Sequence, residues 1–468
     1  MSEGPLHQLG HVHFLGLAGV GVSAVARLMH AAGVSISGTD AKDLPVLEEF
    51  RAAGVPVRVG YSAANLESIA AEAGHPIGTV VASSVATAGN PEYDAAAAAG
   101  CRLLHRSEGL AACMADKRAV AVAGTHGKTT TSSMTAVMLH AAGQQPSFAI
   151  GAVVAGFGTN AQAGAGDWFV AEADESDGSL LNYSPEIAVV TNVEPDHLDH
   201  YGSAEAVDQV FTDFTERIRD GGALILCADD DGARDLHQRT AAALAARGVR
   251  ILTYGTAEDA DLRLSQVQPD GFGQAAVLHH GQHRAALQLD VPGLHNALNA
   301  AAAVAVGTAA GLPLQRCAEA VAAFRGSSRR FELRGEVAGV RVYDDYAHHP
   351  TEVTAVLSAA RSAAGSGRVH AVFQPHLFSR TRDFAAEFGA ALDAADTAVV
   401  LPIYPAREEP IAGVSSELLG HPVLEPREAV VQVAAAAQPG DVVLTLGAGD
   451  VTQLAGDITA ALEGPRAA

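Results

Sequence analysis

Short apolar runs alternate with longer alanine-rich segments along the whole chain. The runs at residues 11–15, 120–123, 369–373 and 442–446 have the length of strands. The stretch after the first glycine-rich turn, to about residue 32, and residues 298–312 have the composition of helices. Strands that alternate with helices favour parallel sheets covered by helices on their faces. The pattern therefore predicts an α/β protein.

A chain of 468 residues is too long for one hydrophobic core, so we expect several domains. Changes in motif content divide it into three. Residues 1–116 form an N-terminal Rossmann-like domain, residues 117–324 a central P-loop ATPase-like α/β domain, and residues 325–468 a C-terminal Rossmann-like α/β domain. We find no internal repeat and no low-complexity linker between them.

The first domain opens with a strand, a glycine-rich turn and a helix. The turn covers residues 16–21, and a second strand at residues 34–38 is followed by Asp40. This layout is typical of dinucleotide-binding folds and, taken alone, would favour a nicotinamide-dependent dehydrogenase. Two serines follow a further apolar run at residues 79–82. The candidate ligand-binding residues of this domain are Gly19, Gly21, Asp40, Ser83 and Ser84.

The second domain begins with a phosphate-binding loop, read in the sequence VAVAGTHGKTTTSSM at residues 120–134. A strand, a glycine-containing loop and a helix start follow in the required order, so backbone N–H groups can surround a nucleotide phosphate. Val122 stands where the common pattern has glycine. The competing interpretation is a glycine-rich turn with an incidental lysine. The candidate nucleotide ligands are Gly124, Thr125, Gly127, Lys128, Thr129 and Thr130.

Two acidic segments follow short strands of the same domain. The first, EADESD, begins with Glu172, which could hold Mg²⁺ together with Thr129. The second, TNVEPDHLDHY, contains His197, which could bind a second metal ion or move a proton. A solvated acidic loop, a zinc site of aspartates and histidines, and a helix terminus capped by aspartate remain alternatives.

Polar clusters also occur further along the chain. His295 and Asn296 precede an alanine-rich helix and could contact a purine edge or act as a helix cap. Arg330 offers a guanidinium group for phosphate. The C-terminal domain has two ionisable segments at strand ends, YDDYAHHPTE and FQPHLFSRT. Of these segments, His376 and Arg380 could bind a small carboxylate or phosphate, and the other candidate residues are Asp345, Tyr346 and His348.

Composition narrows the class of ligand. A formal charge of −23 disfavours nucleic acid and anionic membranes as partners, so we expect a small phosphorylated ligand held by a few local cations. The four cysteines show no CxxC pairing, and the start MSEGPLHQLG has no secretory signal. We expect a cytoplasmic protein without membrane insertion, either a monomer or a homodimer.

The motifs GTHGKTTT, EADESD, TNVEPDHLDHY, GLHNALNAAAA, FRGSSRRFE, YDDYAHHPTE and FQPHLFSRT occur in this order. Together they resemble the Mur ligases of peptidoglycan synthesis over nearly the whole chain. The resemblance implies three domains that bind a UDP-sugar, ATP and an amino acid in turn. It also implies that the turn at residues 16–21 serves UDP-N-acetylmuramate and not NAD.

The resemblance implies a reaction as well. ATP, with Mg²⁺, would activate the lactyl carboxylate of UDP-N-acetylmuramate as an acyl phosphate, and L-alanine would then form the amide, with release of ADP and phosphate. A ligase of murein recycling, which attaches a tripeptide to the same sugar, is the alternative within the family. Outside it, a dehydrogenase and a simple ATPase or nucleotide switch remain for comparison.

Roles for the candidate residues follow from the same resemblance. Lys128 would contact the β and γ phosphates, Thr129 and Glu172 would hold one Mg²⁺, and Glu172 and His197 a second. His295 and Asn296 would lie near adenine, and Arg330 and Asp345 would help to hold the nucleotide. The alanine pocket would comprise Tyr346, His348, His376 and Arg380. Leu377 departs from the family pattern, in which arginine is frequent. The residues implied in catalysis are Lys128, Glu172, His197, His348 and Arg380.

Overall fold

The computed structural model describes residues 6–83, 86–406 and 408–464. The chain divides into two compact units. The first comprises Met1–Val153, Phe157–Thr253 and Ala305–Leu312, and the second comprises Val154–Gly156, Tyr254–Val304 and Pro313–Ala468. The α/β class is confirmed, because strands and helices alternate through both units. The domain boundaries at residues 116 and 324 remain predictions.

The N-terminal sheet has five parallel strands in the order β3-β2-β1-β4-β5. The chain starts at the centre, moves to one edge and then returns to fill the other, which is the strand order of a Rossmann-like half. The strand expected at residues 34–38 lies two residues later. The strands are β1 His11–Leu15, β2 Ile36–Asp40, β3 Val57–Val59, β4 Ile77–Ala82 and β5 Arg102–His105.

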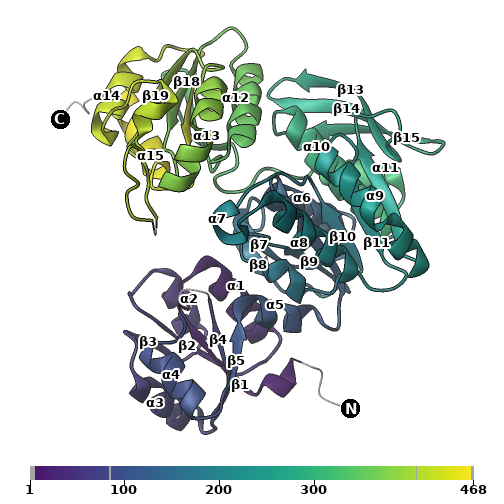
Figure 1. Ribbon diagram of the computed structural model, residues 1–468, viewed down its shortest axis with the longest axis vertical. Coiled ribbons are helices and arrows are strands. Elements are labelled where there is room, and N and C mark those ends of the chain that lie inside the picture. Colours follow the sequence, from purple (N-terminus) through teal and green to yellow (C-terminus); the bar gives the residue numbers. More distant parts are fainter. Residues whose placement is uncertain (1–5, 84–85, 407, 465–468) are drawn as a thin grey trace. The chain divides into compact units, whose positions relative to one another are not determined.

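Helices cover both faces of this sheet (Figure 1). Helices α1 and α5 pack together on one face and α3 and α4 on the other, and apolar side chains from each pair are buried against the strands. The sheet is thus closed to water on both faces but open at its strand ends. The elements are η1 His7–Leu9, α1 Val20–Ala31, α2 Val46–Ala52, α3 Ala63–Ala73, α4 Pro91–Ala98 and α5 Arg106–Met114.

The central sheet places the phosphate-loop strand between the two strands that precede the acidic segments. Strand β6, Arg118–Ala123, pairs in parallel with β9, Trp168–Glu172, and with β10, Ile187–Val190. Within the first unit the order is β11-β10-β6-β9-β7-β8. The remaining elements are α6 Lys128–Ala141, β7 Ser147–Val154, β8 Thr159–Gln162, η2 Ser179–Asn182, α7 Leu198–Tyr201, α8 Ala204–Glu216, β11 Ala223–Cys227 and α9 Asp231–Ala246.

The second unit begins with an antiparallel ribbon that the sequence pattern did not predict. The end of β12, Arg250–Gly255, pairs with β13, Leu262–Asp270, and the chain then reverses twice through β14, Gly273–His280, and β15, His283–Leu289. Glycines at positive φ, such as Gly271 at 59° and Gly281 at 58°, allow these tight reversals. Helices α10 Leu294–Ala309 and α11 Leu314–Val321 follow.

The C-terminal sheet has the order β16-β17-β20-β18-β19, with all neighbours parallel except β16 and β17. Helices α12 and α13 pack on one face and α14 and α15 on the other (Figure 1). The strands predicted at residues 369–373 and 442–446 are found with those bounds. The elements are β16 Glu332–Val337, β17 Val340–Asp345, α12 Pro350–Ala364, β18 Val369–Phe373, α13 Phe378–Leu392, β19 Thr397–Val400, η3 Ser416–Leu419, α14 Pro426–Ala436, β20 Val442–Leu446 and α15 Thr452–Leu462.

None of the helices in the described part of the chain is both long enough and apolar enough to cross a lipid bilayer.

A chain of polar side chains, most of them buried, connects strand β1 with β2 and the residue before it. The two ring nitrogens of His11 lie 3.0 Å from Ser35 Oγ and 2.7 Å from Ser37 Oγ, and His13 Nδ1 lies 2.9 Å from the same Ser37 oxygen. His13 Nε2 is 3.5 Å from the buried carboxylate of Glu92. Burial, with smaller effects from His75 and His13, lowers the pKa of His11 to about 4.

This chain predicts acid sensitivity of the N-terminal domain. The unfolded chain takes up a proton at His11 near its ordinary pKa of about 6.5, whereas the folded domain does so only near pH 4. Stability is therefore lost as the pH falls from about 6.5 towards 4, by about 1–2 kcal/mol at pH 5 for this one group. We expect His11→Asn to reduce the difference between the free energies of unfolding at pH 7 and pH 5, measured by urea denaturation. His30→Asn, at an exposed histidine of α1, should leave that difference unchanged. Equal pH dependence in both variants would contradict the assignment.

Candidate functional site

The phosphate-binding loop follows β6 and depends on two glycines with positive φ. Gly124 has φ 129°, and a Cβ atom there would lie 2.0 Å from Thr191 Oγ1. Gly127 has φ 80° and directly precedes helix α6. Residues with side chains rarely adopt such angles, so this loop shape requires glycine at both positions.

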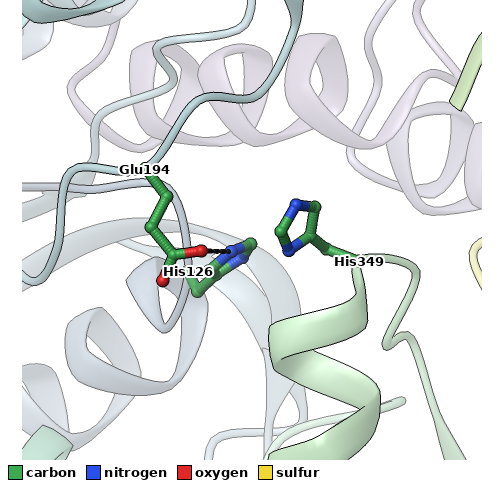
Figure 2. Close-up of side chains that lie close together, drawn as sticks. All are labelled: His126, Glu194 and His349. Atoms are coloured by element: carbon green, nitrogen blue, oxygen red, sulfur yellow. Dashed lines mark ion pairs between the residues drawn. The ribbon is translucent and has the colours of Figure 1, made fainter. Parts of the chain in front are cut away.

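Hydrogen bonds fix the loop to the segment that follows β10. His126 N donates to Asn192 Oδ1 at 2.8 Å, and Asn192 Nδ2 donates to His126 O at 3.2 Å. Glu194 N donates to Thr125 Oγ1 at 2.9 Å. Figure 2 shows the His126 ring beside the carboxylate of Glu194, with Nε2 and Oε2 3.5 Å apart. The segment TNVEPDHLDHY, which follows β10, therefore holds the phosphate-binding loop in its conformation.

Lys128 is held inside the loop by three acceptors. Its Nζ donates to Gly124 O at 2.7 Å, to Thr125 O at 3.0 Å and to Glu175 Oε1 at 2.8 Å. Burial alone lowers the pKa of Lys128, but the carboxylates of Glu175 and Asp174 outweigh it and the pKa is raised. The side chain is thus a permanent cation at the position where phosphate oxygens would enter.

Thr129 and Glu172, the predicted Mg²⁺ ligands, are in direct contact. Thr129 Oγ1 donates to Glu172 Oε1 at 2.9 Å, and the other carboxylate oxygen accepts from Gly151 N at 2.6 Å. A Cβ atom at Gly151 would lie 2.8 Å from that carboxylate, so a larger residue here would displace the Glu172 side chain from its present position. A hydroxyl and a carboxylate oxygen side by side are the kind of ligands that Mg²⁺ takes from proteins, so the pair fits this ion.

His197 lies next to the same buried acid that holds Lys128. Its Nε2 is 3.6 Å from Glu175 Oε1 and 3.7 Å from Asp196 Oδ2. Its φ of 54° is unusual for a residue with a side chain and indicates strain of the kind that collects at functional sites. Its sharing of a metal ion with Glu172 remains a prediction.

The glycine turn of the N-terminal domain is braced by Asp40. The carboxylate accepts from Ala18 N at 2.9 Å and from Lys42 N at 3.2 Å, and Gly16 N donates to Thr39 O at 2.8 Å. Asp40 thus shapes the turn. Ser83 is half-buried after the end of β4, and Ser84 lies outside the described residues.

Near the start of α10, the amide side chain of Asn296 is hydrogen-bonded within its own segment. Asn296 Nδ2 donates to Pro292 O at 2.7 Å, and Asn296 Oδ1 accepts from Asn299 at 3.4 Å. Burial lowers the pKa of the neighbouring His295 to about 4, so its imidazole is neutral near pH 7. Neither contact of the Asn296 side chain is the bond to a backbone N–H of the first turn that a helix cap makes. The adenine contact of both residues remains a prediction.

In the C-terminal domain, Tyr346 is flanked by two arginines. The guanidinium carbons of Arg329 and Arg330 lie 4.9 and 4.8 Å from the centre of its ring. Arg329 also donates to Gly447 O at 2.6 Å, which ties this segment to the loop after β20. Asp345 accepts from two backbone N–H groups, and burial raises its pKa to about 6 although Arg330 opposes the shift.

The structure brings two of the predicted pocket histidines together. The rings of His348 and His376 lie 6.0 Å apart at 78°, and His376 stacks on Tyr404. Arg380 is buried in the first turn of α13. Leu377, directly before that helix, has φ 71° and ψ 140°, a conformation that costs a leucine about 1–3 kcal/mol. Leu377, which stands where arginine is frequent in the family, is therefore a strained residue next to His376.

Sequence reasoning missed two residues of the first unit. Glu175 belongs to EADESD, but consecutive acids look equivalent in sequence, and only the turn of the chain shows that Glu175 faces Lys128 while Glu172 faces Thr129. Arg106 lies far from any motif, yet its Nη2 is 3.5 Å from Asp174 and 3.7 Å from Asp177. No signal in a single sequence could have identified that contact.

The chain belongs to the Mur ligase family. Residues 11–118 match the Mur ligase family catalytic domain, residues 122–307 the Mur ligase middle domain, and residues 329–449 the Mur ligase glutamate ligase domain. These matches follow the three sheets along the chain, and the expected family is confirmed.

Within the family, the chain is similar to ligases that carry one particular name. The chain is 57% identical over 98% of both chains to the UDP-N-acetylmuramate–L-alanine ligase of Paenarthrobacter aurescens (strain TC1). It is 61% identical to the ligase of the same name from Arthrobacter sp. (strain FB24), over 89% of this chain and 86% of that one. The solved structure of UDP-N-acetylmuramate-alanine ligase MurC from Thermotoga maritima matches with a TM-score of 0.77 at 25% identity, over 97% of this chain and 99% of that chain. A murein peptide ligase from Psychrobacter arcticus shares the fold, with a TM-score of 0.70 at 24% identity over 98% and 100% of the two chains.

The buried pair of Lys128 and Glu175 predicts a stability effect that can be separated from activity. Lys128→Ala leaves Glu175, whose side chain is only 2% exposed, without its cation. We expect a loss of about 3 kcal/mol, because an unpaired buried charge is strongly destabilising. Adding Glu175→Gln should restore most of it. The measurement is the free energy of unfolding by urea. Arg118→Ala is the control, because it removes the partly exposed ion pair between Arg118 and Glu186. No recovery in the double variant would count against the pairing.

Proposed function

We propose that this protein is an ATP-dependent ligase that joins L-alanine to the lactyl carboxylate of UDP-N-acetylmuramate. One observation carries the proposal: Lys128, Thr129 and Glu172 converge at the carboxyl ends of adjacent strands in a chain of this family. The names of the two relatives at 57% and 61% identity support L-alanine as the amino acid. The tripeptide ligase of murein recycling is less favoured by the same comparison.

The reaction needs activation because a carboxylate is a poor electrophile. A lactyl oxygen attacks the γ-phosphorus of ATP, the bond to the β–γ bridging oxygen breaks, and ADP leaves with that electron pair. The α-amine of L-alanine then attacks the carbonyl carbon of the acyl phosphate. Collapse of the tetrahedral intermediate expels phosphate, and the amine loses a proton. Positioning and charge stabilisation do most of this work.

Residues of the first unit would supply the charge for phosphoryl transfer. The amine of Lys128 would exchange Glu175 for phosphate oxygens, and the N–H groups of residues 124–130 would surround the same phosphates. Thr129 and Glu172 would hold Mg²⁺, which supplies neutralisation of the phosphate charge when bound. His197 could complete a second metal site with Glu172.

Residues of the second unit would bind the amino acid and part of the nucleotide. The buried guanidinium of Arg380 suits a carboxylate. The rings of His348 and His376, which lie 6.0 Å apart, would complete the pocket. Tyr346, which is flanked by Arg329 and Arg330, would form another wall of the pocket. Arg330 and Asp345, with His295 and Asn296, would serve the nucleotide. Gly19, Gly21, Ser83 and Ser84 would serve the UDP-sugar, with Asp40 bracing their turn.

Phosphate release tests the reaction and the acceptor together. With ATP, Mg²⁺ and UDP-N-acetylmuramate, we expect release to depend on an amino acid and to be fastest with L-alanine, compared with glycine, L-serine and a cell-wall tripeptide. Lys128→Ala in the Glu175→Gln background should abolish release in a folded protein. Release with the tripeptide alone would move the protein to recycling, and release without any acceptor would indicate a simple ATPase.

The pocket assignment predicts a selective effect of His348→Ala. Loss of one hydrogen bond to a charged substrate should raise KM for L-alanine about tenfold or more, while KM for ATP changes little. His283→Ala, at an exposed histidine of β15, is the matched control. Equal increases for both substrates would place His348 outside the pocket. The monomer-or-homodimer state and the cytoplasmic location stay predictions.

A further inference from the structure

The antiparallel ribbon of β13, β14 and β15 has one buried face and one open face. Leu264, Leu278 and Leu287 belong to the buried face, and α11 packs against β15 (Figure 1). The side chains of the open face alternate with these along the strands, and none of them is buried. They form three rows across the strands, which are Arg263, His279 and Arg284, then Ser265, Val277 and Ala286, then Gln268, Ala275 and Gln288.

The rows of the open face contain no acidic residue, although the chain has 53 aspartates and glutamates. Their three basic groups lie side by side, because His279 on β14 pairs directly with Arg263 on β13 and with Arg284 on β15. Like charges directly opposite each other on neighbouring strands are destabilising. The basic row therefore lowers the stability of the ribbon unless an anion lies beside it.

The protein itself supplies no such anion to the two arginines of the row. Among the described residues, neither Arg263 nor Arg284 has an ion pair or a side-chain hydrogen bond. Partly exposed arginines elsewhere, such as Arg58, Arg247 and Arg361, each pair with an acid. In a chain so rich in acids, an external anion accounts for two neighbouring arginines that have none.

His279 is placed to share that anion. Ser265 Oγ lies 2.7 Å from its Nε2, whereas its Nδ1 has no hydrogen bond among the described residues. Burial lowers the pKa of His279, and Arg284 and Arg263 lower it further. An anion bound between the arginines would offset their repulsion and favour the charged imidazole, whose Nδ1–H could then donate to it.

The composition of the open face narrows the class of anion. Its rows hold no aromatic side chain on which a nucleic-acid base could stack and no aromatic anchor of the kind that dominates protein interfaces. Binding would rest on charge, which suits a small ion. The two arginines lie two strand spacings, about 10 Å, apart, so each guanidinium can hold its own anionic group. A phosphoryl group carries up to about two negative charges near pH 7, more than a carboxylate, and so matches this row better.

We propose that the open face of the ribbon binds a small anion with at least two linked phosphoryl groups, held by Arg263 and Arg284 with His279 between them. A free polyphosphate and the phosphate chain of a nucleotide share this chemistry. None of these three residues belongs to the predicted ligase site, and the anion site does not depend on the ligase reaction.

Titration calorimetry with tripolyphosphate tests the site in the full-length protein. Lys128→Ala with Glu175→Gln forms the background, because it impairs the phosphate-binding loop as a second anion site, and the buffer contains no Mg²⁺. Adding Arg263→Gln and Arg284→Gln should weaken binding about tenfold or more, because hydrogen bonds to a charged ligand are lost. Arg102→Gln with Arg427→Gln, at exposed arginines of β5 and α14, removes the same charge elsewhere and is the control. Orthophosphate and citrate should both bind more weakly than tripolyphosphate.

His279 gives a second measurement, on the unaltered protein. We expect tripolyphosphate to raise the pKa of His279, measured by NMR, and to leave that of the exposed His30 unchanged. The signal of His279 is identified by its loss in His279→Asn. This measurement needs no arginine variant, so it decides even if such a variant does not fold.

Three results would overturn the anion site. They are unchanged affinity in the variant with both ribbon arginines replaced, an equal loss in the control variant, and a pKa of His279 that does not move. Orthophosphate or citrate bound as tightly as tripolyphosphate would refute linked phosphoryl groups as the ligand. ATP bound more tightly than tripolyphosphate would support the site with a nucleotide as its source, and ATP bound equally or more weakly would support a free polyphosphate.

The anion site and the ligase reaction can fail separately. In the otherwise unaltered protein, Arg263→Gln with Arg284→Gln should leave phosphate release with L-alanine unchanged at saturating substrates, because neither arginine belongs to the predicted ligase site. A protein that releases phosphate but binds tripolyphosphate equally well with and without these arginines would retain the proposed function and lose only this inference.

Discussion

The buried ion pair between Lys128 and Glu175 is the contact on which the nucleotide site depends. A lysine inside a loop of backbone carbonyls is stable only with an anion close by, and Glu175 supplies it at 2.8 Å. The same acid lies 3.6 Å from His197. An incoming phosphate would replace one anion by another, so the lysine stays charged in both states and the site needs little reorganisation to accept ATP.

Strand order brings these groups together. Because β6 lies between β9 and β10, the phosphate loop, Glu172 and the Asn192 segment leave the sheet at the same edge. Parallel strands all present their carboxyl ends there, where backbone groups and helix starts can meet a ligand. The glycines at 124 and 151 then remove side chains at the two closest approaches, to Thr191 and to Glu172. The nucleotide site is thus formed by the strand order and by glycines that let neighbouring segments come close.

Much of this could be predicted from sequence, because the signals are local. The strands at 369–373 and 442–446, the phosphate loop and the pair of Thr129 and Glu172 follow from short patterns. The ligand-binding role predicted for Asp40 remains a prediction, whereas its contacts to Ala18 and Lys42 show that it braces the backbone of the turn. The choice of Glu175 over its acidic neighbours and the approach of Arg106 depend on how distant segments pack, which no single sequence displays. The β13 to β15 ribbon was missed because its alternating polar strands carry a weaker signal than buried parallel ones.

The overall charge explains why these few cations matter. A chain of net charge −23 repels polyanionic substrates over most of its surface. A cation such as Lys128 therefore has to create local attraction, yet both Lys128 and Arg106 are bordered by acids of one short segment, residues 174–177. Those acids keep isolated cations from standing unpaired in the ligand-free protein. They also weaken non-specific anion binding, since any phosphate must displace or share an existing partner. Only a ligand with several charged oxygens in the right geometry gains enough binding free energy to displace these acids. This favours nucleotides over simple anions.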